Sequence, residues 1–283
     1  VEQSLALNEG VARSHVLRGR ILLEMDRLDE ALDALHRAEA INSENVDAQY
    51  YLGIIYERIT EYSNAIQHYQ NAADLDPENA QFIVAAAEVM IDNDHVNQAE
   101  KYILSRRDRF EHNAGVRQTL GHIAMIENEK AKALRMFEEA RLLAPEDADI
   151  LEDLVRTQIS LNMFREADMN LTKLLKKPGV RETRRDLLHM HAHCLVELGR
   201  FIEARDEYLG LAKGDDGAGD VDAWIGLGNV SCIIKDSQRN RLAANRVMAL
   251  APDQEEGYLL RAIYHRRRGE LDDAIKYLDL AIA

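Results

Sequence analysis

Apolar and small side chains recur along this chain with a period of 34 residues, and the period defines eight units. Counted from 1 to 34 within a unit, large apolar residues recur at position 7, as in Leu52 and Leu120, and at position 24, as in Tyr69 and Phe137. Two such positions supply the inward stripes of two successive helices. The units begin at Ala12, Val46, Ala80, Ala114, Ala148, Arg185, Val221 and Glu255, with three extra residues before the sixth unit and two before the seventh.

Small residues occupy two fixed places in the unit. Position 8 is Gly or Ala except at Val155 in the fifth unit, and position 20 is Ala except at Asn240 in the seventh. Because the side chains at a contact set the distance between two helices, these positions predict a close crossing. Arg106 stands at position 27 of the third unit, where a small residue is usual. We therefore expect altered helix packing in the third, fifth and seventh units.

Turn residues fall between the two expected helices and between units. Position 15 is Gly, Asn or Asp in six of the eight units, and these residues best tolerate the left-handed conformation that ends a helix. Pro77, Pro145, Pro178 and Pro252 stand at position 31 or 32, where one unit gives way to the next. None interrupts an expected helix, where a proline costs about 3 kcal/mol. The pattern predicts an all-α fold with about sixteen main helices and no sheet.

Two of the units match the residue pattern of a known repeat family at several positions. In the second unit, 46–79, the matching residues are Leu52, Gly53, Tyr56, Ala65, Tyr69, Ala72 and Pro77. In the seventh they are Trp224, Leu227, Gly228 and Pro252. The chain thereby resembles the tetratricopeptide repeat family over essentially its whole length. The resemblance implies a right-handed superhelical solenoid of helix-turn-helix repeats, about seven of them complete, with a partial repeat at either end.

The same pattern suggests a division of the chain. Residues 1–11 fit the tail of a preceding repeat helix, and residues 12–283 form the array, whose last repeat is incomplete. The segment 213–220, rich in Gly and Asp, is the candidate break between two sub-arrays.

The net charge of the chain indicates which kind of partner it binds. The formal charge is −15, with −12 on residues 1–147 and −3 on residues 148–283. This argues against nucleic acid, which binds surfaces with a surplus of Lys and Arg, and it favours a protein partner with basic segments. No apolar run of about 18 residues and no leader is visible, so we expect no membrane insertion in this segment. Cys194 and Cys232, both inside expected helices, favour buried thiols and a reducing, cytoplasmic setting.

Candidate chemistry is sparse. His189 and His193 share a helix face with Asp186, a spacing that suits a transition metal, but without ligands from a second helix we interpret them as ordinary helix residues. The arginine-rich segments 181–185 and 266–268 are interpreted as solvated faces. No phosphate loop, nucleophile elbow or zinc motif is present, so we expect no cofactor, no metal and no enzyme activity.

The resemblance also implies where a partner would bind. In the family, ligands touch positions 2, 5, 6, 9, 12 and 13 of the first helices, on the concave side. The residues that we assign to partner binding at such positions are Val16, Leu17, Arg20, Tyr50, Tyr51, Ile54, Arg58, His122, Arg156 and Asn229. The leading interpretation is a scaffold that holds a protein segment in this groove. The alternatives are the non-catalytic arm of a larger enzyme, such as a transferase, and self-association through open terminal helices. Leu17 and Tyr51 alternatively pack against a neighbouring first helix.

Overall fold

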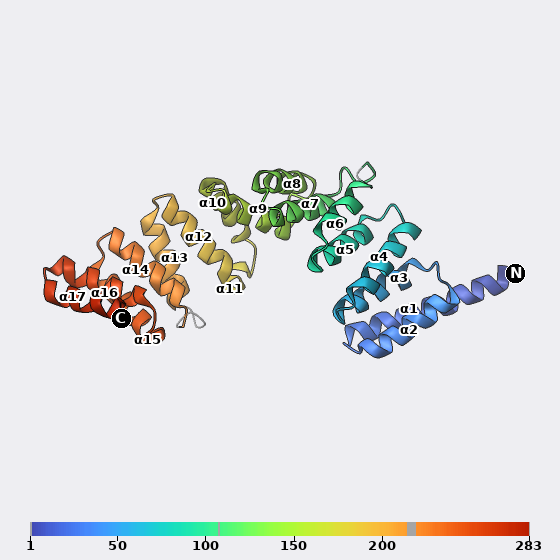
Figure 1. Cartoon of the computed structure of the whole chain (residues 1–283), viewed down its shortest axis with the longest axis horizontal. Coiled ribbons are helices and arrows are strands. Elements are labelled where there is room, and N and C mark those ends of the chain that lie inside the picture. The colour runs from blue at the N-terminus through green and yellow to red at the C-terminus, as the bar shows by residue number, and fades with distance from the viewer. Residues whose placement is uncertain (1, 107, 214–218, 283) are drawn as a thin grey trace. The chain divides into compact units, whose positions relative to one another are not determined.

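The computed structural model describes residues 2–106, 108–213 and 219–282, and these residues form helices and turns without a strand (Figure 1). The chain divides into two compact units, residues 1–150 and residues 151–283, which are treated separately below. Within the described residues no helix is both long and apolar enough to cross a membrane.

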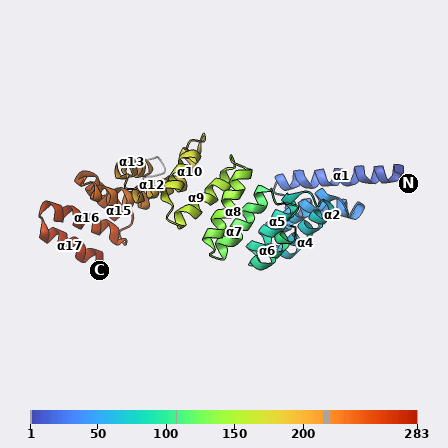
Figure 2. The ribbon, with the colours of Figure 1, turned by 90° about the horizontal axis from the view of Figure 1, so that it is seen from above.

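The first unit contains four helical hairpins. Its helices are α1 (Glu2–Glu24), α2 (Leu28–Ile41), α3 (Val46–Arg58), α4 (Tyr62–Leu75), α5 (Ala80–Asp92), α6 (Val96–Leu104), α7 (Ala114–Ile126) and α8 (Lys130–Leu143). Each second helix packs on its own first helix, and α2, α4 and α6 also pack on the first helix of the next hairpin (Figure 2). Residues 2–11, expected in a preceding repeat helix, run without a break into α1, because they contain no proline and Gly10 keeps a negative φ.

The second unit continues the same pattern. Its helices are α9 (Ala148–Ser160), α10 (Phe164–Leu174), α11 (Val180–Thr183), α12 (Arg185–Glu197), α13 (Phe201–Lys213), α14 (Val221–Ile233), α15 (Ser237–Leu250), α16 (Glu255–Arg268) and α17 (Leu271–Ile282). The short α11 occupies the extra residues before the sixth sequence unit. The expected break at 213–220 falls mostly on residues 214–218, which lie outside the described residues.

A single left-handed residue reverses the chain inside every hairpin. The residue at position 15 has φ between 58° and 79° in all eight. The prediction made for Gly, Asn and Asp is confirmed, and Thr60 and Lys235 adopt the same conformation although neither residue type favours it.

The helices of a hairpin approach closely because glycine leaves room for a large side chain. A Cβ on Gly53 would lie 2.6 Å from the Tyr69 ring, and a Cβ on Gly121 would lie 2.5 Å from the Phe137 ring. In these two hairpins the side chain at position 24 therefore fills the space above position 8. Ala31, Ala65, Ala99 and Ala133, at position 20, are fully buried.

The three residues that depart from the small-residue pattern pack in different ways. α6 ends at Leu104, and Arg106 follows it with its guanidinium 4.1 Å from the centre of the Tyr102 ring. Val155 is fully buried. Asn240 is also buried, and its Nδ2 donates to Cys232 Sγ over 3.0 Å. Cys194 is buried and Cys232 half-buried, both as free thiols.

Candidate functional site

The predicted residues of α1 differ in exposure. Val16 is only 6% exposed and belongs to the core shared by α1, α2 and α3, so it offers no surface to a ligand. Leu17 is 53% exposed. Arg20 is exposed, and its guanidinium lies 5.8 Å from the centre of the Tyr51 ring, a cation–π arrangement between α1 and α3.

Tyr50 is part of an aromatic cluster that joins α3, α4 and α5. Its ring centre lies 5.5 Å from that of Tyr51, 5.7 Å from that of Tyr69 and 5.1 Å from that of Phe82. Gln81 Nε2 donates to the Tyr50 hydroxyl over 2.7 Å. Tyr50 thus stabilises the contact between neighbouring repeats and leaves only part of its ring for a partner.

Tyr51 and Ile54 are half-buried against the core of α1–α3, so the packing role considered for Tyr51 is seen in the structure. Arg58 is exposed and forms an ion pair with Asp26 over 3.4 Å. His122 is half-buried on α7, with its ring centre 5.4 Å from that of Phe137.

Acidic side chains gather on the first helices of the second and third repeats. Desolvation by the surrounding helices raises the pKa of Glu88 above 4.5; His122 opposes this rise, and the carboxylates of Glu57 and Asp92 add to it. The Tyr69 hydroxyl donates to Glu57 Oε2 over 2.6 Å. We call Glu57, Glu88 and Asp92, together with Tyr50 and Tyr51, the acidic face.

Glu88 and Asp92 were not among the predicted site residues. They occupy positions 9 and 13 of the third unit, which are ligand positions in the family pattern. Applying that pattern to the third unit would have found them from the sequence. The effects of Glu57 and His122 on the pKa of Glu88, by contrast, depend on how α3, α5 and α7 pack.

Arg156 and Asn229 belong to the second unit. Arg156 contacts Glu152 over 2.7 Å and Asp186 over 3.2 Å, and Arg184 pairs with the same two carboxylates over 2.7 and 2.8 Å. This network fixes Arg156 in an ion-pair role. Asn229 is exposed on α14.

The histidine cluster and the arginine run of the second unit also have internal partners. His189 Nε2 lies 2.9 Å from Asp220 Oδ2, whereas the His193 ring packs edge-on against Phe164, with 5.6 Å between ring centres. Asp186, the third residue of the suggested metal set, pairs with arginines instead. In the arginine run, Arg181 pairs with Glu207 over 2.8 Å and Arg185 with Asp220 over 2.5 Å.

A different set of possible metal ligands lies near the turn between α16 and α17. Atoms of His265, Glu270 and Asp273 lie within 4.8 Å of one another. Glu270 accepts from His265 over 2.7 Å and from Arg268 over 2.7 Å, so ion pairing accounts for the grouping.

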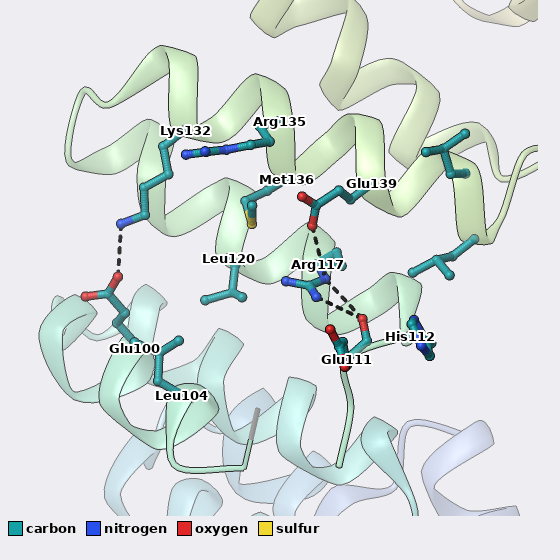
Figure 3. A pocket seen from close by; sticks show the side chains of 12 residues that line it. Glu100, Leu104, Glu111, His112, Arg117, Leu120, Lys132, Arg135, Met136 and Glu139 are labelled. Atoms are coloured by element: carbon teal, nitrogen blue, oxygen red, sulfur yellow. Dashed lines mark hydrogen bonds and ion pairs between the residues drawn. The ribbon is translucent and has the colours of Figure 1, made fainter. Parts of the chain in front are cut away.

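A cavity of about 670 Å³ lies in the first unit among α6, α7, α8 and the segment that follows α6 (Figure 3). Its apolar lining consists of Leu104, Leu120, Met136, Leu142 and Leu143. At one side Lys132 Nζ contacts Glu100 Oε1 over 3.0 Å, and at the other Arg117 contacts Glu139 over 3.3 Å. The cavity lies on the second-helix side of the repeats and shares no residue with the acidic face.

Comparison with known proteins shows which family the chain resembles. Two family models described as tetratricopeptide repeat match residues 16–80 and 60–123. BBSome complex member BBS4 of Bos taurus is 24% identical over 155 residues, and the match covers 54% of this chain and 30% of that protein. This chain thus spans about a third of its relative's length.

Solved structures share the fold at low sequence identity. PilF of Pseudomonas aeruginosa is 16% identical, with a TM-score of 0.63 over 74% of this chain and 94% of that chain. YrrB, described as a TPR protein with an unusual peptide-binding site, is also 16% identical, with a TM-score of 0.60 over 67% of this chain and 95% of that one. Together with the 34-residue period and the hairpins closed by left-handed residues, these matches show that the chain is a tetratricopeptide repeat protein.

Proposed function

We propose that the chain is a protein-binding scaffold whose acidic face receives a basic segment of a protein partner. Tetratricopeptide repeats are in general protein–protein interaction modules, but the fold by itself names no partner. What supports this particular surface is the raised pKa of Glu88: desolvation raises it most, the nearby carboxylates of Glu57 and Asp92 add to the rise, and His122 partly compensates for it.

A lysine or arginine side chain placed among Glu57, Glu88 and Asp92 would stabilise their ionised forms and relieve this repulsion. Tyr50, whose ring contacts that of Tyr51, lies near enough to Glu57 and Glu88 for their charges to raise its pKa, and an aromatic face attracts a cation further. The formal charge of −12 on residues 1–147 would speed the encounter with a basic segment, an effect that added salt would weaken.

The test uses a labelled peptide that alternates lysine with alanine, and the same peptide with glutamate in place of lysine. The lysine peptide should bind the chain, and Glu57→Gln combined with Glu88→Gln should weaken it roughly 3- to 10-fold, since an exposed ion pair contributes up to about 1 kcal/mol. Affinity should fall as the pH is lowered, and the fall should begin above 4.5, the ordinary value for glutamate, because the pKa of Glu88 is raised.

The matched control is Asp33→Asn combined with Glu138→Gln, which removes two exposed carboxylates from the second helices α2 and α8. Net charge then changes equally in both variants. Equal weakening by both pairs would show that binding follows net charge alone, and the assignment to the acidic face would be rejected.

A further inference from the structure

The cavity of Figure 3 lies beside a helix that is shorter than its counterparts. α6 has nine residues, whereas α4 and α8, the second helices of the flanking repeats, have fourteen each. The difference exceeds one helical turn of 3.6 residues. After Leu104 the chain leaves the helix, and Phe110 rather than a helical residue enters the core. We call the cavity between the last turn of α6 and α8, with its volume of about 670 Å³, the α6–α8 groove.

The apolar lining of the α6–α8 groove includes a residue that is unusual for its position. Position 29 is exposed in every described repeat, and elsewhere it carries only small or charged residues: Ala40, Asp74, Asp108, Lys176, Lys213 and Ala249. The fourth repeat has Leu142 there, 75% exposed, beside Leu143 at 40% and Leu104 at 44%. A large apolar side chain at an outward position, grouped with two others around a cavity, marks an interaction site.

The cations of the groove differ in their partners. Lys132 contacts Glu100 and Arg117 contacts Glu139, as the dashed lines of Figure 3 show. Arg135, on the same wall of the cavity, has no anionic partner among the described residues. Lys132 already contacts Glu100, Glu127 and Glu129, so Arg135 is the cation of this wall that is open to the carboxylate of a bound segment.

We propose that the α6–α8 groove is a second docking site, which binds a short amphipathic helix of a protein partner. The helix takes the place of the missing last turn of α6. Its apolar side chains lie against Leu104, Leu142 and Leu143, and an acidic side chain pairs with Arg135. A chain with both sites would hold a basic segment on its first helices and an acidic, apolar helix on its second helices, at the same time.

The experiment selects peptides from a displayed library of short helical sequences, with the full chain as target and its Leu142→Asp variant as counter-target. Both substitutions used here place a residue that another repeat already carries at the same position, so the fold should be kept: Asp as in Asp74, and Arg135→Gln as in Gln67. Enriched peptides are then synthesised and their affinities measured. They should carry apolar residues three or four apart and at least one acidic residue on the same face.

The expected result is a loss of affinity of at least about tenfold for Leu142→Asp and about threefold for Arg135→Gln, while Glu57→Gln with Glu88→Gln leaves binding unchanged. Circular dichroism and thermal unfolding of each variant verify the fold. No enrichment over the Leu142→Asp target, or enriched peptides that bind both proteins equally, would overturn the proposal. Basic peptides whose binding is weakened only by Glu57→Gln with Glu88→Gln would also overturn it, and would support the acidic face alone.

Discussion

At the scale of single residues, the absence of a methyl group decides how closely two helices of a hairpin pack. Gly53 lies under the ring of Tyr69, and Gly121 lies under that of Phe137. The small residues of the sequence pattern predicted a close crossing of the two helices. They did not predict that the large side chain at position 24 fills the space above the glycine. The same holds for the turns: Gly, Asn and Asp were predictable at position 15, whereas Thr60 and Lys235 adopt a left-handed φ only because the packed hairpin requires it.

Gly53→Ala should therefore destabilise the chain by about 1–3 kcal/mol, because its methyl group would lie 2.6 Å from the Tyr69 ring. The control is Gly210→Ala on α13, where a Cβ meets no atom within 4 Å and the better helix propensity of alanine should add up to about 1 kcal/mol. Chemical denaturation measures both. A shift of both variants in the same direction would contradict this account of the crossing.

At the scale of an element, four first helices, α3, α5, α7 and α14, begin after a side chain that caps them. Asn45, Asn79, Asn113 and Asp220 each accept a hydrogen bond from a backbone N–H of the helix that follows. Asn or Asp directly before a unit was readable from the sequence. The early end of α6 and the short α11 were not, because they depend on how Arg106 and the extra residues before Arg185 pack. For the same reason the family pattern located Tyr50 but could not foresee its contacts with Phe82 and Gln81.

Asp220 combines the cap of α14 with two charged partners. Burial raises the pKa of its carboxyl, but hydrogen bonds from Arg185, the Ala223 N–H and His189 outweigh it and hold the pKa below 3.8. The stabilisation is therefore present above pH 3.8 and is lost as the pH falls through the lowered pKa. Asp220→Asn keeps a capping oxygen and removes the charge, so it should cost about 1–3 kcal/mol at neutral pH and make the acid-induced loss of stability smaller.

Asp147→Asn is the control for this substitution. Asp147 is exposed, and its Oδ1 accepts from the Asp149 N–H over 3.0 Å at the start of α9. Its replacement should change the free energy of unfolding by less than about 0.5 kcal/mol. If the two variants lose equal stability, the charged contacts of Asp220 contribute nothing measurable.

At the scale of the whole molecule, the hairpins form two compact units, residues 1–150 and residues 151–283. The sequence suggested a division at 213–220 from the Gly and Asp content of that segment. Composition reports the local preference of a segment for turns, whereas a division into units depends on contacts summed over many helices. In repeat proteins such contacts join mainly neighbours, so separate parts of the array are able to unfold at different conditions.

We expect that the two units do not unfold in one two-state transition. Tryptophan fluorescence follows the unfolding of the second unit alone. Trp224 is the only tryptophan, and it is buried in the second unit. Gly53→Ala, in the first unit, should shift the denaturation curve measured by circular dichroism and leave the one measured by Trp224 fluorescence in place. Coincident curves that move together would show a single cooperative unit.

The left-handed turn inside each hairpin bears on how such a chain tolerates changes in length. In all eight hairpins one residue of positive φ stands at the same position, and only two or three residues separate the two helices. The extra residues of the fifth-to-sixth and sixth-to-seventh connections instead follow a second helix, and α11 forms within the first of them. Evolutionary insertions, like loops or labels added by an experimenter, are therefore accommodated between hairpins and excluded from the turns within them.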